Sequence, residues 1–297
     1  MLPTVVLTAG LGTRLDPITR YVAKPAVPMA GKTLVERVLE WLQREGIKDV
    51  VLNLHHLPES ITSVVGDGSA LGVRVRYSWE PVILGSAGGP KQALTLLPGL
   101  TGPCLIVNGD TLTDVPLTPL IAAHRASGAR VTMAVVPNTR PDHYNGIRVD
   151  EHHRVTEFVA KGHTDKTWHF VGVQVVNADV FDGLTAGTPA ETVAGVYRDL
   201  VRTDPGSVHV WTVEAPFLDV GTPADYIAAV LHTAGTDTFV VEGSSVVDST
   251  AVLTRCVVWD GASVGAEATL TDCVVLTGAR VPAGTVAERK VFERAET

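Results

Sequence analysis

The chain has 297 residues, of which 45% are hydrophobic and 19% charged, and its formal net charge is −8. This length allows one large domain with a smaller one, and an acidic balance without a Lys/Arg cluster excludes a typical nucleic-acid partner. No apolar run approaches the roughly 18 residues of a membrane span, and we see no signal peptide. The three cysteines match neither a disulfide framework nor a zinc spacing, so we expect a cytoplasmic protein.

The first predicted strand, residues 4–9, breaks into the turn Gly10-Leu11-Gly12-Thr13-Arg14. A glycine-rich turn between a strand and a helix exposes backbone N–H groups that can hold phosphate. Arg14 and Lys24 add positive charge beside it. On its own the turn is equally compatible with phosphate binding and with an ordinary connection that carries a surface arginine.

Two familiar phosphate motifs are excluded. Leu15 stands where the dinucleotide fingerprint G-x-G-x-x-G needs its third glycine. Ala26 stands where a P-loop ending in Gly31-Lys32-Thr33 would need its first glycine.

Helices and strands then alternate along the chain. The apolar patterns predict helices over residues 33–45, 57–65, 91–97 and 117–127, and strands over 49–54, 73–79, 104–107 and 130–136. This alternation predicts an α/β fold with a doubly wound, mostly parallel sheet. Ligands of such sheets bind beyond the carboxyl ends of the strands, which is where the Gly10 turn follows the first strand.

Two further segments have the composition of binding loops. Residues 84–89, LGSAGG, predict a glycine-rich loop whose bare backbone can approach the edge of a nucleobase. Asn108-Gly109-Asp110 follow the strand at 104–107. A carboxylate at that position suits Mg²⁺, although an isolated Gly-Asp more often stabilises a tight turn.

From residue 144 the alternation of helices and strands stops. Strand-like pieces at 146–149, 154–159 and 168–176 have no long helices between them, which predicts a meander over the carboxyl end of the sheet, suited to an acceptor pocket. His152, His153, His163 and His169 lack the spacing of metal ligands, so we expect them on the surface. Asp219 precedes a Gly-Thr-Pro helix start, and the helix extends to about residue 234.

The tail contains a repeat. Aliphatic residues recur every six residues at Val240, Val246, Val252, Val258, Val264, Leu270 and Leu276. This period predicts a short left-handed parallel β-helix of roughly two coils that ends near Pro282. We therefore expect domains at residues 1–236 and 237–297, with Cys256 and Cys273 near one another as core or flank residues of the repeat.

The first turn and its continuation read G-x-G-T-R-L-x-P-x-T, followed by the K-P-x-x-P of Lys24 to Pro28. This run resembles the signature of sugar-1-phosphate nucleotidylyltransferases, and the resemblance extends over about residues 5–281. It implies a Rossmann-like nucleotidyltransferase fold, an NTP and a sugar 1-phosphate as substrates, pyrophosphate as a product, and Mg²⁺ as the cofactor.

The resemblance also implies roles for individual residues. The implied catalytic residues are Arg14, Lys24 and Lys161, and the implied metal ligands are Asp110 and Asp219. The implied nucleotide-binding residues are Thr8, Ala9, Gly10, Gly12, Thr13, Arg14, Lys24, Gly85, Ser86, Ala87, Gly88 and Asp110. The implied sugar-binding residues are Asn145, Gly146, Lys161 and Gly172.

The sequence departs from the family pattern at several positions. Ala23 replaces the proline that usually precedes Lys-Pro, and Phe170 replaces an asparagine. In the segment that resembles E-F-x-E-K-P, Ala160 replaces the sugar-binding glutamate and Gly162 replaces the proline. Lys161, between them, is retained and can still hold the acceptor phosphate.

The LGSAGG segment and the short tail look most like mannose-1-phosphate guanylyltransferases, so we expect GTP and mannose 1-phosphate. The altered E-K-P segment and Trp168-His169-Phe170 look more like N-acetylmuramate-1-phosphate uridylyltransferases, and a glucose-1-phosphate thymidylyltransferase is a third alternative. Proteins of two other classes share some of these features. A hexapeptide-repeat acyltransferase is disfavoured because the last histidine, His232, precedes the repeat. The other is a non-catalytic nucleotide-sugar sensor or regulatory subunit. The exposed coils of the repeat suggest a homodimer.

Overall fold

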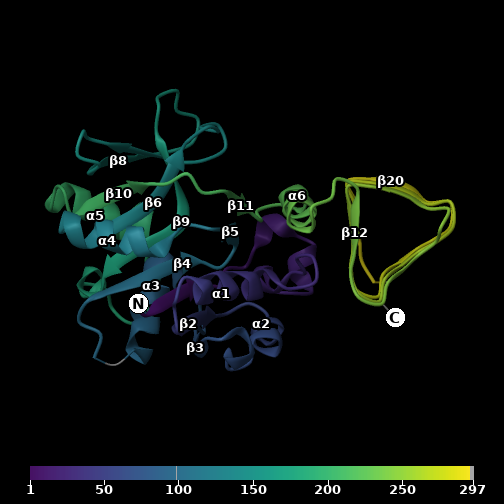
Figure 1. Cartoon of the computed structure of the whole chain (residues 1–297), viewed down its shortest axis with the longest axis horizontal. Coiled ribbons are helices and arrows are strands. Elements are labelled where there is room, and N and C mark those ends of the chain that lie inside the picture. Colours follow the sequence, from purple (N-terminus) through teal and green to yellow (C-terminus); the bar gives the residue numbers. More distant parts are fainter. Residues whose placement is uncertain (98, 295–297) are drawn as a thin grey trace. The chain divides into compact units, whose positions relative to one another are not determined.

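The computed structural model describes residues 1–97 and 99–294 (Figure 1). It contains two compact units. The first unit comprises Met1–Gly10, Val38–His56 and Val65–Phe217, and the second comprises Leu11–Arg37, Leu57–Val64 and the chain from Leu218 onward. Within the described part of the chain no helix has both the length and the apolarity needed to cross a membrane.

The first unit is built on a central sheet. Its strand order is β10-β6-β9-β4-β1-β2-β3. The bounds are β1 (Thr4–Leu7), β2 (Asp49–Leu54), β3 (Arg74–Trp79), β4 (Pro103–Asn108), β6 (Val131–Pro137), β9 (Trp168–Asn177) and β10 (Val208–Thr212). β1 pairs in parallel with β2 and β4, as do β2 with β3 and β6 with β10, whereas β9 lies antiparallel between β4 and β6. The predicted α/β fold with a mostly parallel sheet is confirmed.

The predicted meander over residues 144–176 is wrong in one respect. β7 (Gly146–Val149) and β8 (Val155–Val159) form an antiparallel hairpin, and β7 pairs with β9 at Ile147 and Trp168. β9 itself is a central strand rather than part of a cover. Its residues 171–176 are all buried, because a strand in the middle of a sheet is apolar on both faces.

Six α-helices accompany the described strands. Their bounds are α1 (Leu34–Arg44), α2 (Pro58–Val65), α3 (Gly85–Ala93), α4 (Leu117–Ser127), α5 (Tyr197–Thr203) and α6 (Pro223–Ala234). Two further short strands are β5 (Thr111–Thr113) and β11 (Phe217–Asp219), and short 3-10 helices include those at Thr13–Leu15 and Lys24–Ala26. α3 packs on β1, β2 and β3, while α4 packs on β6, β9 and β10. The loop predicted at residues 84–89 is wrong, because Leu84 caps α3 and residues 85–89 form its first turns. α5 and β10 were not predicted.

In the second unit the chain from Phe239 to Phe292 forms a β-helix, seen end-on as a triangle in Figure 1. One side consists of β12 (Phe239–Val241), β15 (Cys256–Val258), β18 (Val274–Val275) and β21 (Val291–Phe292). The other sides are β13 (Val246–Val247), β16 (Ser263–Val264) and β19 (Arg280–Val281), and β14 (Val252–Thr254), β17 (Thr269–Thr271) and β20 (Val286–Glu288). The strands of each side pair in parallel, which fits the predicted left-handed β-helix.

The predicted six-residue period of the β-helix is wrong. β12 and β15 pair Phe239 with Cys256, and β15 and β18 pair Val257 with Val274, so each coil has 17 residues. The shortened corner contains Arg255, Asp272 or Arg289, each with a positive φ. Val246, which the strict period places inside, is therefore 66% exposed, and its neighbour Val247 packs against the interior. The coils also continue past Pro282, to give three coils and the first strand of a fourth.

A buried hydroxyl joins α6 to the β-helix and to the segment that follows Lys24. The Tyr226 hydroxyl donates to the Pro28 carbonyl at 2.7 Å and accepts from Trp259 Nε1 at 2.8 Å. Gly31 N–H donates to the Glu242 carboxylate at 2.9 Å. These bonds connect the β-helix to the segment that contains Lys24. Cys256 and Cys273 are buried free thiols in the core of the β-helix, the first of the two positions expected for them.

Candidate functional site

In the second unit, the glycine-rich turn is packed against the stem of Lys24. Gly12 has a φ of +63°, a left-handed conformation that favours glycine. A Cβ at this position would lie 2.9 Å from Thr19 Cγ2 and 3.2 Å from Lys24 Cβ. The Thr19 hydroxyl also donates to the Gly12 carbonyl at 3.2 Å. Gly12 is thus required both by backbone conformation and by the close approach of Lys24.

Two cations of this unit converge on Asp219. Lys24 Nζ lies 3.8 Å from Asp219 Oδ1, and Arg14 Nη2 lies 4.0 Å from Asp219 Oδ2. The Lys24 side chain is only 8% exposed, whereas that of Arg14 is 62% exposed. An ammonium taken out of water needs a nearby anion, which Asp219 supplies. The arrangement holds one buried and one accessible cation ready for a polyanion.

The start of α6 fixes the residues that follow Asp219. Thr222 and Asp225 form a reciprocal capping box, in which Thr222 N–H donates to Asp225 Oδ2 at 2.9 Å. A Cβ at Gly221 would lie 3.1 Å from Arg14 Nη1 and 3.2 Å from Asp219 Oδ2. The absence of a side chain at Gly221 therefore lets the arginine reach the carboxylate.

In the first unit, a buried polar chain connects Thr8, which follows β1, to the start of α3. Asn53 Oδ1 accepts from the Thr8 N–H at 2.7 Å, and Asn53 Nδ2 donates to Glu80 Oε1 at 2.7 Å. Glu80 Oε2 accepts from the Leu84 N–H at 2.8 Å, and Glu80 is fully buried. Sequence reasoning missed Asn53 and Glu80. The available signal was a polar residue at the carboxyl end of an apolar strand, which requires hydrogen-bond partners when buried.

The LGSAGG segment makes close contacts with a distant part of the same unit. Ala87 N–H and Gly88 N–H donate to the Ala190 carbonyl at 2.9 and 3.2 Å. Ser86 donates from both its N–H and its hydroxyl to Glu191 Oε2. A Cβ at Gly88 would lie 2.5 Å from the Thr188 carbonyl oxygen. Intramolecular packing thus explains the glycines, and several of the backbone donors proposed to face a nucleobase already have acceptors.

Asp110 follows the carboxyl end of β4. Gly109 N–H donates to the Leu7 carbonyl at 2.9 Å. A Cβ at Gly109 would lie 2.7 Å from Leu7 O and from Thr8 Cγ2. The glycine therefore lets the residue before Asp110 pack against the end of β1, where the glycine-rich turn begins.

The predicted sugar-binding residues of the hairpin lie together. Asn145 Oδ1 accepts from the Lys161 N–H at 3.0 Å. A Cβ at Gly146 would lie 2.6 Å from Thr167 Oγ1 and 2.7 Å from His163 Nε2. The remaining predicted sugar-binding residue is Gly172. It has a φ of +80°, and a Cβ at this position would lie 2.9 Å from Asn108 Cβ.

Next to Asn145 and Gly146, a partly exposed group of aromatic rings is formed by Tyr144, His169 and Phe217. Tyr144 stacks on His169 with ring centroids 4.0 Å apart, and Phe217 lies 5.1 Å from His169. Burial lowers the pKa of His169 to about 4, so its ring is neutral at pH 7. The expectation that His163 and His169 are surface residues is wrong, because both are half-buried and have specific partners.

The predicted site residues fall in both units. Arg14, Lys24 and Asp219 meet in the second unit, and Asn145, Gly146 and Lys161 meet in the first. Among the described residues no group of three or more His, Cys, Asp and Glu side chains forms a protein cage for a metal. Mg²⁺ needs only one or two carboxylates when substrate phosphates and water complete its shell, and Asp110 and Asp219 have suitable chemistry.

Comparisons with known proteins agree on the class of the chain. A family model described as nucleotidyl transferase matches residues 3–235. The chain is 36% identical over 225 residues to the N-acetylmuramate alpha-1-phosphate uridylyltransferase of Neisseria meningitidis, covering 73% of this chain and 92% of that protein. It is 30% identical over 224 residues to the mannose-1-phosphate guanylyltransferase of Mycobacterium tuberculosis, covering 75% of this chain.

The chain is also 30% identical over 241 residues to the UTP–glucose-1-phosphate uridylyltransferase of a Synechocystis species, covering 76% of this chain. It spans 62% of the length of this relative and of the Mycobacterium protein. Among solved structures, HddC from Yersinia pseudotuberculosis complexed with GMP-PN is similar, with a TM-score of 0.67 and 22% identity, covering 78% of this chain and 99% of that one. At this identity the likeness concerns the fold alone.

Proposed function

The chain belongs to the nucleotidyl transferase family, and on this basis we propose that it transfers a nucleoside monophosphate from an NTP to a sugar 1-phosphate. The observation that carries the proposal is the convergence of Lys24 and Arg14 on Asp219. Two cations beside one carboxylate suit a polyphosphate that carries a divalent cation.

An oxygen of the acceptor phosphate attacks the α-phosphorus, and the bond from that phosphorus to the departing pyrophosphate breaks. No general base is needed, because a phosphate monoester has a second pKa of about 6 and is mostly a dianion at neutral pH. Catalysis then consists of positioning and of neutralising charge.

Each charged residue has one role in this scheme. Arg14 binds the pyrophosphate that leaves, Lys24 binds the α-phosphate, and Lys161 binds the acceptor phosphate. Asp110 and Asp219 would hold Mg²⁺, which when bound neutralises charge on the phosphate oxygens.

Backbone groups of the glycine-rich turn, from Thr8 to Thr13, contact the triphosphate. The base lies against the start of α3, at Gly85 to Gly88. Hydrogen bonds from that segment to Ala190 and Glu191 fix its shape.

For the substrates we propose GTP and mannose 1-phosphate, supported by the likeness of the LGSAGG segment and the short tail to guanylyltransferases. One observation favours an alternative pair, UTP and N-acetylmuramate 1-phosphate. The Lys161 loop departs from the family pattern at Ala160 and Gly162, and Gly162 has a φ of +90°, which proline cannot adopt. A homodimer through the β-helix and a cytoplasmic location stay predictions.

The test is the formation of NDP-sugar and pyrophosphate by the Asp110→Asn variant. We expect kcat to fall at least about 100-fold, as for the loss of a preorganised charged group. Asp114→Asn is the control, because Asp114 is an exposed carboxylate near by in the sequence whose partner is Arg44 at 3.5 Å. Equal rates for the two variants would contradict the role given to Asp110.

A further inference from the structure

Lys161 lies in the loop of residues 160–167, between β8 and β9, and the backbone of this loop has an unusual conformation just after the lysine. Gly162 has a φ of +90°, and its N–H donates to the Pro141 carbonyl at 2.7 Å. A proline at this position could neither adopt that φ nor donate that bond. The loop therefore lacks the stiffness that a Lys-Pro sequence would give, and hydrogen bonds set its shape instead, including that from the Lys161 N–H to Asn145 Oδ1.

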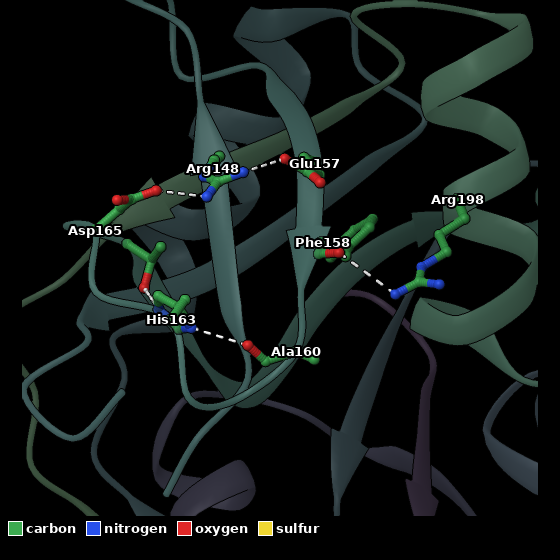
Figure 2. Close-up of polar contacts among 8 residues, drawn as sticks. Arg148, Glu157, Phe158, Ala160, His163, Asp165 and Arg198 are labelled. Atoms are coloured by element: carbon green, nitrogen blue, oxygen red, sulfur yellow. Dashed lines mark hydrogen bonds and ion pairs between the residues drawn. The ribbon is translucent and has the colours of Figure 1, made fainter. Parts of the chain in front are cut away.

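His163 spans the loop from one side to the other. Its Nδ1 lies 3.0 Å from the Ala160 carbonyl oxygen, and its Nε2 lies 2.7 Å from Thr167 Oγ1. Figure 2 shows the dashed line from the His163 ring to the Ala160 carbonyl oxygen. Because a carbonyl oxygen only accepts, Nδ1 carries the hydrogen, and in the neutral ring Nε2 accepts from the threonine hydroxyl.

The His163 ring acts as a brace across the loop, and its Thr167 end is held in place by the surrounding structure. Thr167 is buried, and its carbonyl accepts from the Asn138 N–H at 2.9 Å. Gly146, where a Cβ would lie 2.7 Å from His163 Nε2, leaves just enough room for the ring. The ring thus occupies the space where a side chain at Gly146, a predicted sugar-binding residue, would lie, and it holds the peptide carbonyl that immediately precedes Lys161.

A second contact between the loop and the hairpin is exposed. Arg148 forms ion pairs with Glu157 and with Asp165, as Figure 2 also shows. Exposed pairs of this kind contribute little stability. His163 is half-buried and joins two neutral partners, so it is the more effective constraint on the backbone near Lys161.

We propose that His163 is a positioning residue that holds the Lys161 backbone for the acceptor phosphate. The proposal rests on the proposed function in giving Lys161 that role. The sequence replaces the rigid Lys-Pro of the family by a flexible glycine and a histidine brace two residues after the lysine.

The first test is independent of activity and uses amide hydrogen exchange of the full chain without substrate. In His163→Ala, we expect the peptide that covers residues 160–167 to exchange at least about tenfold faster, while peptides from β9 stay unchanged, since losing the brace opens only the loop. Thr167→Val should act like His163→Ala, whereas Thr167→Ser, which keeps the hydroxyl, should exchange like the wild type. His152→Ala, on the exposed turn of the same hairpin, is the control. Unchanged exchange in both His163→Ala and Thr167→Val would overturn the brace.

The second test uses the substrate pair that the wild type turns over. We expect His163→Ala to raise KM for the sugar 1-phosphate about tenfold while KM for the NTP changes less than about twofold, because only the acceptor side loses its constraint. Adding His163→Ala to Lys161→Ala should have no further effect on the acceptor KM. Faster exchange with an unchanged acceptor KM would overturn the link to Lys161. A wild type that turns over no pair would overturn the proposed function, and with it this role, while the exchange data would still decide whether the brace exists.

Discussion

Lys24 Nζ lies 3.8 Å from Asp219 Oδ1, and the two residues are almost two hundred positions apart in a 297-residue chain. The lysine side chain is nearly buried, so its position is fixed by packing before any ligand arrives. Groups held in place in advance stabilise developing charge most effectively, because they need no reorganisation during the reaction. This pair is the reason to treat the glycine-rich turn as a functional site.

Arg14→Ala should lower kcat for nucleotidyl transfer at least about 100-fold, because it removes the accessible cation proposed for the departing pyrophosphate. Arg20→Ala is a matched control. Arg20 lies in the same segment and is as exposed as Arg14, at 61% against 62%, but pairs with Asp16. Steady-state rates of pyrophosphate release check this prediction, and similar rates for the two variants would remove Arg14 from the mechanism.

Gly12→Ala should lose more stability and more activity than Gly31→Ala. Both glycines have a positive φ, so alanine costs each about 1–2 kcal/mol of backbone strain. Only at Gly12 would the new Cβ press on Lys24; at Gly31 there is no atom within 4 Å. We expect a lower melting temperature in Gly12→Ala than in Gly31→Ala. At a temperature where both variants are folded, kcat/KM should be at least about tenfold lower in Gly12→Ala alone. Equal activity in the two variants would mean that the position of Lys24 is unimportant.

Val264→Ala and Val246→Ala make the same chemical change at two positions of the β-helix. Val264 is 2% exposed and Val246 is 66% exposed. Urea unfolding should show a loss of about 2 kcal/mol for Val264→Ala, the cost of two buried methyl groups and the space they leave. Val246→Ala should stay within about 0.5 kcal/mol of the wild type. Equal losses would restore the strict six-residue period and contradict the 17-residue coil.

The half-buried His169 ring should lower the free energy of unfolding as the solution becomes acidic. Burial lowers its pKa from 6.5 to about 4, so between these values the unfolded chain binds a proton that the folded chain does not. The free energy of unfolding should therefore decrease by about 2–3 kcal/mol as the pH falls from 7 to 4. In His169→Phe, which keeps a ring against Tyr144, this part of the pH dependence should vanish. Denaturation curves of both proteins at each pH provide the measurement, and parallel pH profiles would contradict the burial of His169.

Much of the fold could be predicted because local apolar patterns determine it. The runs at residues 49–54 and 104–107 became β2 and β4 almost to the residue. The place of β9 could not be predicted, since a buried valine-rich strand has the same pattern in any direction and beside any neighbour. The start of α3 was missed because glycine and serine favour a loop, and the contacts that order it come from Ala190 and Glu191, about a hundred residues later.

The β-helix was recognised from its repeat but with the wrong coil length. Val258, Val264 and Leu270 do lie inside and happen to be six residues apart. The corners at Arg255, Asp272 and Arg289 each shorten a coil by one residue. A corner of this kind depends on backbone conformation rather than on the spacing of aliphatic residues.

The candidate site was predictable where the motif itself contains the chemistry. Arg14, Lys24 and Asp219 were assigned from the sequence, and the structure brings them together. Asn53, Glu80 and His163 were missed because each acts through a partner that the sequence does not identify. For Glu80 and His163 these partners are the Leu84 N–H and the Ala160 carbonyl, both backbone groups.

The most direct test of the central claim is pyrophosphate release in the presence of Mg²⁺. GTP, UTP, dTTP, ATP and CTP would each be paired with mannose, glucose and N-acetylmuramate 1-phosphates, with identification of the NDP-sugar formed. We predict strong turnover with one pair, GTP and mannose 1-phosphate, and its loss in Arg14→Ala. Turnover with another pair would keep the reaction and correct the substrates. No turnover with any pair, together with thermal stabilisation by a nucleotide, would contradict the account and favour a nucleotide-sugar sensor.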